Sequence, residues 1–284
     1  MVIDSHQHFW HYDPARHGWI TEEMSPLRRD FLPEEYAQQC DESEIDASVL
    51  VQVDQAEAET LFLLNLAEGN DRIAGVVGWV DLRSPRLESR LSHFSRFKKL
   101  RGFRHIAQAE GDDRFLIQPD FLKGIAQLHR FRFTFDILIY PKQLPAAIEL
   151  VSRLPQQPFV LDHAAKPLIK AGLGEPWSSH IKTLAQNPNV FCKLSGLITE
   201  ADWHHWNPGD FSPYLDVLFE AFGPERLMFG SDWPVCLLAA TYAQVKQLIE
   251  IYVDAHALQY KEKIFGLNAA SFYGIKAAHH GSAA

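Results

Sequence analysis

MVIDSHQHFW, residues 1–10, joins a short apolar run to two closely spaced histidines. A run of this length is typical of a buried β-strand, which we place at Met1–His8. Seven further segments share its short apolar character and its content of β-branched or aromatic residues. They are Ser48–Asp54, Ile73–Val80, Leu100–Ile106, Phe133–Tyr140, Phe159–His163, Val190–Ser195 and Leu227–Ser231. The chain is therefore predicted to contain eight strands.

Helical patterns separate most of these strands. Apolar residues recur with helical spacing in Glu57–Gly69, Pro119–Arg130, Lys142–Leu154 and Trp177–Gln186, and in Ala239–Tyr252 after the last strand. This alternation predicts a parallel sheet, and eight repeats in about 250 residues are the number that closes a barrel. We therefore predict an α/β fold, a (β/α)8 TIM barrel that forms a single domain over residues 1–275, followed by a frayed tail at 276–284.

One segment departs from the alternation. Residues from His11 to Tyr36 contain Trp19 and three prolines without a clear period. Because the segment follows the first strand directly, it is predicted to be a long βα loop on the face where a barrel carries its active site. A lid, a wall of the substrate site and a solvent-facing insertion all fit this segment.

Composition excludes several kinds of partner. The 284 residues include 27 Lys and Arg against 36 Asp and Glu, which gives a formal net charge of −9. Because no basic run offsets this acidic balance, we expect neither nucleic acid nor membrane as a partner. The three cysteines, Cys40, Cys192 and Cys236, are too few and too scattered for a disulfide framework. The chain also lacks a secretory signal and any apolar stretch of roughly 18 residues, so we predict a cytoplasmic protein, with homo-oligomerisation left open.

The first strand carries the strongest local signal for chemistry. Asp4, His6 and His8 are spaced by two residues and are expected on one face of the strand. Two imidazoles at one strand end suit a divalent metal, or two hydrogen-bond donors aimed at one developing oxyanion. The alternative is that the histidines cap a strand near a flexible terminus.

Three other predicted strands end in comparable groups. Arg104 and His105 end the fourth strand, His163 ends the sixth and Asp232 ends the eighth. Any one of these side chains is explained equally well by packing. Because strand ends converge in a barrel, the four strand ends together predict one functional site.

Seven motifs spread over the chain carry a resemblance to a known family. They are DSHQHFW at 4–10, AGVVGWVDLRSP at 74–85, LRGFRH at 100–105, LIYPKQLP at 138–145, FVLDHAAKP at 159–167, FCKLSGLITEADW at 191–203 and LMFGSDWPVCLLA at 227–239. With them the sequence resembles the amidohydrolase superfamily, in the amidohydrolase-related branch (amidohydrolase 2) that includes sugar-lactone hydrolases of the fuconolactonase type and pyrone-dicarboxylate lactonase. The resemblance runs nearly from end to end and implies a distorted barrel. It also implies that His6, His8 and Asp232 face a bound metal and the hydrolytic water, with His163 beside them.

The sequence departs from the usual metal site of this superfamily. The fifth strand ends in FDILIYP without a histidine, and the fourth offers His105 where a bridging Lys is common. At most one metal is therefore expected, held by His6, His8, His163 and Asp232, a set that satisfies a tetrahedral zinc site. The similar pyrone-dicarboxylate lactonase works without a metal, so the same side chains are also able to polarise a carbonyl directly. Zinc and metal-free catalysis both stay open, and no organic cofactor is expected.

Candidate substrate contacts lie at or near the predicted strand ends. Arg104 offers a planar fork for a carboxylate or hydroxyl, and Trp19, Trp79 and Trp233 offer flat faces for a sugar ring. Each also has a structural explanation: Lys193 equally reaches solvent and Trp79 equally packs in the core. The predicted substrate-binding set is Gln52, Trp79, Arg104, His105, Tyr140 and Lys193, with Gln108 and Lys166 as further candidates.

These residues match the needs of lactone hydrolysis. The reaction requires a base for water, an electrophile on the carbonyl oxygen and a proton for the departing alkoxide. We assign Asp232 as base and later proton donor, and His6, His8 and His163 as the electrophilic group. A serine nucleophile is disfavoured because no Gly-x-Ser-x-Gly motif is present. Two alternatives use the same barrel: a metal-dependent decarboxylase of a small aromatic or unsaturated acid, and a non-catalytic barrel that binds a small molecule.

Overall fold

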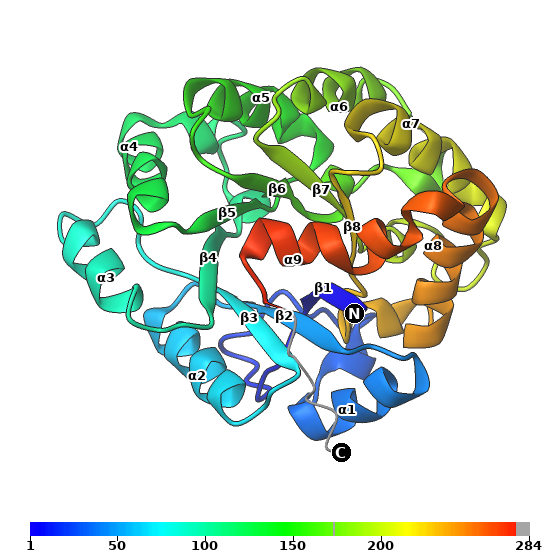
Figure 1. The fold of residues 1–284 in the computed structure, drawn as a ribbon, viewed down its shortest axis with the longest axis horizontal. Coiled ribbons are helices and arrows are strands. Elements are labelled where there is room, and N and C mark those ends of the chain that lie inside the picture. Colours follow the sequence, from blue (N-terminus) through cyan, green and yellow to red (C-terminus); the bar gives the residue numbers. More distant parts are fainter. Residues whose placement is uncertain (173, 277–284) are drawn as a thin grey trace, which may run out of the picture.

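The computed structural model describes residues 1–172 and 174–276 and contains a ring of eight parallel strands in this range. Helices surround the ring on its outside (Figure 1). The strands pair in chain order, from β1 to β8, as the alternating pattern predicts. Their bounds are β1 Ile3–Gln7, β2 Ala47–Val51, β3 Ile73–Gly78, β4 Leu100–His105, β5 Thr134–Ile137, β6 Phe159–Leu161, β7 Val190–Leu194 and β8 Leu227–Phe229. The predicted (β/α)8 barrel is confirmed.

The described α-helices follow the strands in sequence. They are α1 Pro33–Glu42, α2 Glu57–Glu68, α3 Leu87–Phe94, α4 Pro119–Leu128, α5 Leu144–Arg153, α6 Trp177–Ala185, α7 Ser212–Phe222, α8 Tyr242–His256 and α9 Asn268–Tyr273. The sequence predicted α2, α4, α5, α6 and α8 and missed the others. The predicted loop from His11 to Tyr36 is wrong at its end, because α1 begins at Pro33, a residue favoured at the first helical position. None of the described helices has the length and apolar content of a membrane span.

The barrel closes where β1 meets the segment after β8. The backbone N–H of Asp232 donates to the carbonyl of His6 at 2.8 Å, and that of His8 donates to the carbonyl of Trp233 at 2.7 Å. An isolated bridge pairs Gln7 with Trp233. This seam places the histidine pair of the first strand directly beside Asp232.

An apolar layer fills the amino-terminal half of the barrel. Side chains from several strands contribute, namely Ile3, Val49, Val51, Val77, Val160 and Met228. Helix α9 packs on this layer through Ala269 and Tyr273 and lies across the middle of the ring in Figure 1. Polar side chains are thereby left at the carboxyl ends of the strands, where barrels carry their sites. The predicted tail at 276–284 lies, apart from Lys276, outside the described residues.

Candidate active site

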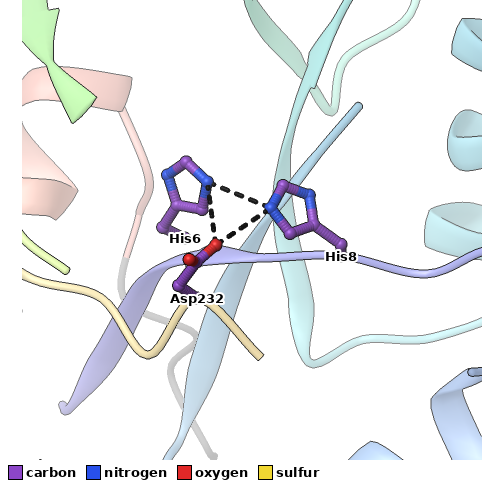
Figure 2. Close-up of side chains that lie close together, drawn as sticks. All are labelled: His6, His8 and Asp232. Carbon is purple, nitrogen blue, oxygen red and sulfur yellow. Dashed lines mark hydrogen bonds and ion pairs between the residues drawn. The ribbon is translucent and has the colours of Figure 1, made fainter. Parts of the chain in front are cut away.

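Three side chains meet at the β1–β8 seam (Figure 2). His6 Nε2 lies 3.2 Å from His8 Nε2, and Asp232 Oδ1 lies 3.2 Å from His8 Nε2 and 3.7 Å from His6 Nε2. His6 is fully buried and the other two side chains are almost so. Gly230 permits the approach, since a Cβ there would lie 2.8 Å from the Cβ of His6. The predicted convergence of the first and last strands is therefore present in the structure.

The backbone fixes the orientation of His8. Its Nδ1 lies 2.7 Å from the carbonyl oxygen of Val51, which accepts hydrogen bonds only. In the neutral ring the proton is therefore on Nδ1, and the lone pair is on Nε2. That lone pair faces the carboxylate of Asp232, so two acceptors face each other and require a cation or a shared proton between them.

His163 completes the cluster from an unusual turn. It follows β6, and the four residues from His163 to Lys166 all have positive φ. Such a left-handed turn costs roughly 1–2 kcal/mol per residue and is found mainly where function holds it in place. Ser195 Oγ lies 2.9 Å from His163 Nδ1, and His163 Nε2 lies 3.9 Å from Asp232 Oδ1. The turn thus aims the ring at Asp232.

His6, His8 and Asp232 have the spacing of ligands to one divalent metal. A tetrahedral zinc site with metal–ligand distances of about 2.0–2.1 Å places its ligand atoms about 3.3 Å apart. The separations of 3.2, 3.2 and 3.7 Å among His6, His8 and Asp232 lie close to that value. His163 is the fourth candidate ligand; its Nε2 lies 3.9 Å from Asp232 Oδ1, and it also forms a group of possible ligands with His6 and Asp162.

Local electrostatics favour the protonation states that a metal takes. Burial lowers the pKa of His163 to about 4, although the charges of Asp232 and Asp162 act in the opposite direction. Burial also lowers the pKa of His6, and the charge of Lys193 lowers it further. Burial alone would raise the pKa of Asp232, but the interactions with His163, His8 and His6 outweigh it and hold that pKa below its ordinary value. Neutral imidazoles and an ionised carboxylate are the forms that bind zinc.

A buried ionic cluster lies behind His6, one layer deeper in the barrel. Lys193 Nζ lies 2.6 Å from Asp136 Oδ2, 2.9 Å from Asp162 Oδ1 and 3.0 Å from His6 Nδ1. Arg104 Nη1 lies 3.1 Å from Asp162 Oδ2 and 3.2 Å from His6 Nε2. Two cations thus face two carboxylates, and the cluster contacts both ring nitrogens of His6, through Lys193 at Nδ1 and Arg104 at Nε2.

Several predicted substrate contacts are corrected by these positions. Lys193 is fully buried in the ionic cluster and is not exposed to a substrate. Gln52 is also fully buried, and its backbone and side-chain carbonyls accept hydrogen bonds from Arg104. Arg104 itself reaches the histidine cluster, at His6.

His105 lies on the other side of β4 from Arg104. Neighbouring residues of a strand alternate between its faces, and His105 stacks on Phe115 with ring centres 4.8 Å apart. Its Nε2 lies 2.7 Å from Glu110 Oε1, and its Nδ1 accepts from Trp79 Nε1 at 3.3 Å. His105 thus lies with Glu110, Trp79 and Phe115 and not beside Arg104, and its role in substrate binding stays a prediction.

Two further expectations fail for reasons of packing. Trp233 is 1% exposed and packs edge-on against Phe9 and Phe31, so it offers no free face to a sugar. Asp4 does not share a face with His6, because the register of β1 shifts between Asp4 and Gln7. The Asp4 carboxylate makes no bond to a side chain of the histidine cluster and instead accepts from the hydroxyls of Ser231 and Tyr242.

The rim of the site retains aromatic and charged groups. Tyr140 is 38% exposed and Trp79 is half-buried. Lys166 Nζ lies 5.7 Å from the centre of the Tyr140 ring and 3.7 Å from Glu200 Oε1. Burial raises the pKa of Glu200, Lys166 opposes this rise and the charge of Asp232 adds to it, which places Glu200 within electrostatic reach of the cluster. Tyr140, Lys166 and Glu200 are therefore exposed or partly exposed groups near the cluster, whereas the Trp79 indole bonds to His105.

Sequence reasoning missed Asp136, Asp162, Ser195 as a partner of His163, and Glu200. Asp136 and Asp162 each interrupt or follow an otherwise apolar run, FDILI and FVLD. A carboxylate at the end of a buried strand is costly unless it is paired, so this pattern was a usable signal. Glu200 ends a short 3-10 helix, Ile198–Glu200, after β7 and carries no comparable signal.

Comparisons with known proteins agree with this geometry. Two relatives named L-fucono-1,5-lactonase come from Burkholderia multivorans and Burkholderia ambifaria. The first is 42% identical over 97% of this chain and 96% of its own, and the second is 35% identical over 96% and 95%. A crystal structure of an amidohydrolase from Burkholderia multivorans with bound zinc has 41% identity and a TM-score of 0.94, with 97% of this chain and all of the other covered.

The family itself follows from the extent of these matches. The model of the family described as amidohydrolase covers residues 3–275, from β1 through the end of α9. The resemblance seen in the sequence is therefore confirmed, and this chain belongs to the amidohydrolase family.

Proposed function

We propose that this chain hydrolyses a sugar lactone, and specifically a six-membered ring of the L-fucono-1,5-lactone kind. The observation that carries the proposal is the convergence of Asp232 with three imidazoles at the carboxyl mouth of the barrel. The names of two relatives at 42% and 35% identity support the substrate class.

Asp232 is the base in this proposal. Its contacts with His6, His8 and His163 all use Oδ1, so Oδ2 is the oxygen that serves the attacking water. The water oxygen bonds to the lactone carbonyl carbon while its proton passes to the carboxylate. The bond between that carbon and the ring oxygen then breaks, and the proton moves from Asp232 to the departing alkoxide. The product is an open-chain hydroxy acid, and water is the only co-reactant.

The carbonyl oxygen gains negative charge during the attack and needs a positive partner. His6, His8, His163 and Asp232 are the residues that would hold a zinc ion, and a bound zinc ion supplies a Lewis acid there. Arg104 Nη1, at 3.2 Å from His6 Nε2, adds a fixed positive charge to the same place. The strained turn at His163 and the carbonyl of Val51 hold the imidazoles before substrate arrives.

The rim supplies groups suited to sugar hydroxyls. Tyr140 and Trp79 offer aromatic surface, while Lys166 and Glu200 offer a donor and an acceptor. A site built to hydrogen-bond hydroxyls discriminates strongly against analogues that lack them. We infer that stereochemical choice is made by this rim and not by the buried cluster.

A panel of aldono-1,5-lactones and aldono-1,4-lactones, assayed by proton release, tests the proposal. The expected result is a kcat/KM for L-fucono-1,5-lactone about tenfold or more above that for its C-4 epimer, with the hydroxy acid as product. The Asp232→Asn variant serves as the control for spontaneous ring opening. Absence of catalysed opening of every lactone would contradict the proposal, and carbon dioxide release from aromatic acids would point to the decarboxylase alternative.

A further inference from the structure

The carboxylate of Asp4 joins the two strands that carry the candidate catalytic groups. Its Oδ1 accepts from the backbone N–H of Ser231 at 2.9 Å and from that of His6 at 3.1 Å. Ser231 immediately precedes Asp232, so one carboxylate bonds to the backbone beside the proposed base and to the backbone of a proposed metal ligand. Asp4 itself makes no contact with the atoms that would react.

The other oxygen of Asp4 accepts hydrogen bonds from side chains of two helices and from Ser231. Its Oδ2 accepts from Ser231 Oγ at 2.5 Å, from the Tyr36 hydroxyl at 2.8 Å and from the Tyr242 hydroxyl at 3.0 Å. Tyr36 lies on α1 and Tyr242 on α8, and all of these groups are buried. The carboxylate is thereby held from both α1, the first helix, and α8, the helix that follows β8.

This arrangement matters because regular strand pairing at the β1–β8 seam is short. In the described residues the backbone is joined by the bridge of Gln7 with Trp233 and by two backbone bonds near it, and Ser5 Oγ adds a bond to the carbonyl of Phe229 at 2.6 Å. Hydrogen bonds to an ionised carboxylate are roughly twice as strong as neutral ones. Two of the five bonds on Asp4, both from Ser231, cross the seam, and the other three hold the carboxylate on its own strand and on α1 and α8, on the side away from the substrate.

We propose that Asp4 is a positioning residue that sets the separation between the His6–His8 pair and Asp232. It acts through Ser231 and through the backbone of His6, and its catalytic consequence rests on the proposed lactone hydrolysis. Its spacing in the sequence, two residues before His6, places it at the register shift of β1, so that it faces the helices while His6 faces the site.

Asp4→Asn tests the proposal, because the amide keeps the shape but loses one acceptor oxygen and the charge. We expect kcat to fall about 10- to 100-fold, the range for residues that orient metal ligands, with KM within about threefold of the parent. Zinc affinity, measured by competition with a chelator, should fall with it. The matched control is Asp46→Asn, whose carboxylate also accepts a backbone N–H near β1, from Val2 at 2.7 Å, but at the far end of the strand. This control should behave as the parent.

A second pair of variants covers the case in which Asp4→Asn does not fold. Tyr36→Phe and Tyr242→Phe together remove two donors from Asp4 and keep both rings, and kcat should fall severalfold. Tyr252→Phe is the control: Tyr252 lies on α8 like Tyr242, but its hydroxyl bonds to Asp216 of α7, so this variant should leave kcat unchanged.

If Asp4→Asn folds and its kcat is within threefold of the parent, the proposal is overturned. If Asp4→Asn does not fold, the same result in the double Tyr variant overturns it. A parent that opens no lactone would show that the proposed function fails. Crystal structures then decide the positioning role: the His8 Nε2–Asp232 Oδ1 separation, 3.2 Å here, should change in Asp4→Asn, and an unchanged separation would reject it.

Discussion

Lys193 Nζ lies 3.0 Å from His6 Nδ1, on the opposite side of the imidazole from His8 and Asp232. The ammonium group is fully buried and paired with Asp136 and Asp162. Tyr273 of α9 donates to the same Asp136 oxygen at 2.8 Å. The His6 ring is therefore held at Nδ1 by a neutralised ionic cluster and faces the candidate metal site with Nε2, so it has little freedom to rotate.

The first prediction concerns the stability of this cluster. Lys193→Met should destabilise the protein by about 3–5 kcal/mol, because it leaves buried carboxylates without their cation. The matched control is Lys182→Met, which removes an exposed pair with Glu220 at 2.9 Å and should cost about 0–1 kcal/mol. Urea unfolding followed by circular dichroism measures both. Equal destabilisation of the two variants would refute the role given to the cluster.

The second prediction concerns the proposed base. Asp232→Asn should lower kcat by at least about 100-fold, because an amide keeps the shape but does not accept the proton of water. Asp202→Asn, which changes a carboxylate paired with Lys170 at 3.1 Å, is the control and should retain activity. Initial rates on the best lactone of the panel give the comparison. A rate for Asp232→Asn within tenfold of the parent would remove Asp232 from the mechanism.

The sequence predicted the barrel and the convergence of His6, His8, His163 and Asp232 because both follow from simple rules. Strand–helix alternation sets the topology, and residues that end the strands of a barrel must meet at one mouth. The three histidines each have a ring nitrogen within 3.9 Å of Asp232 Oδ1. The catalytic and metal-binding roles of the four residues stay predictions.

The misplaced residues show what periodicity does not contain. Lys193 is the penultimate residue of β7, one layer below the mouth, and a sequence gives no depth within a barrel. Asp4 was placed beside His6 by the period of two, but a register shift in β1 turns it to the helices. The missed helix α3 is eight residues long, and a periodic signal over so few residues is weak.

The third prediction concerns Gly196, which has φ +61°. A Cβ there would lie 2.4 Å from His163 Nδ1, so Gly196→Ala should displace that ring and lower kcat by roughly 100-fold. Gly223→Ala is the matched control, since Gly223 has φ +65° and nothing within 4 Å of an added Cβ. Both variants should lose about 1–2 kcal/mol of stability from the left-handed backbone, but the control should keep its activity. Full activity in Gly196→Ala would mean that the position of His163 is not critical.

The fourth prediction is a pH dependence of stability that originates at Glu59. Burial raises the pKa of this carboxyl to about 7 from an ordinary value of 4.5, although Val53 N donates to it at 2.6 Å. The folded state therefore binds more protons than the unfolded state between about pH 4.5 and 7. The free energy of unfolding should be highest below this pH range and should fall as the pH rises through it. The loss should be on the order of 3 kcal/mol, since one pKa unit corresponds to about 1.4 kcal/mol.

Glu59→Gln isolates this effect, because the amide oxygen still accepts from Val53 but does not titrate. Free energies of unfolding of parent and variant, measured at pH 5 and pH 7.5, should converge at the lower pH and differ in favour of the variant at the higher one. Parallel pH profiles for the two proteins would show that Glu59 is not the group responsible.

The last prediction concerns the metal content. His6, His8 and Asp232 form one cluster, with His163 Nε2 3.9 Å from Asp232 Oδ1, and the second carboxylate near His6, that of Asp162, is paired with Lys193 and Arg104. Elemental analysis should therefore find no more than one zinc per chain, and two equivalents would contradict the site as described. His8→Ala should lose zinc and turnover together, because the ring that holds the metal also completes the electrophilic site. If a chelated, zinc-free parent keeps its full rate, the imidazoles act directly as donors, and His8→Ala should then still cost about 2.7–4 kcal/mol of transition-state stabilisation. A His8→Ala variant with the parent's rate in both conditions would show that the histidine pair is structural.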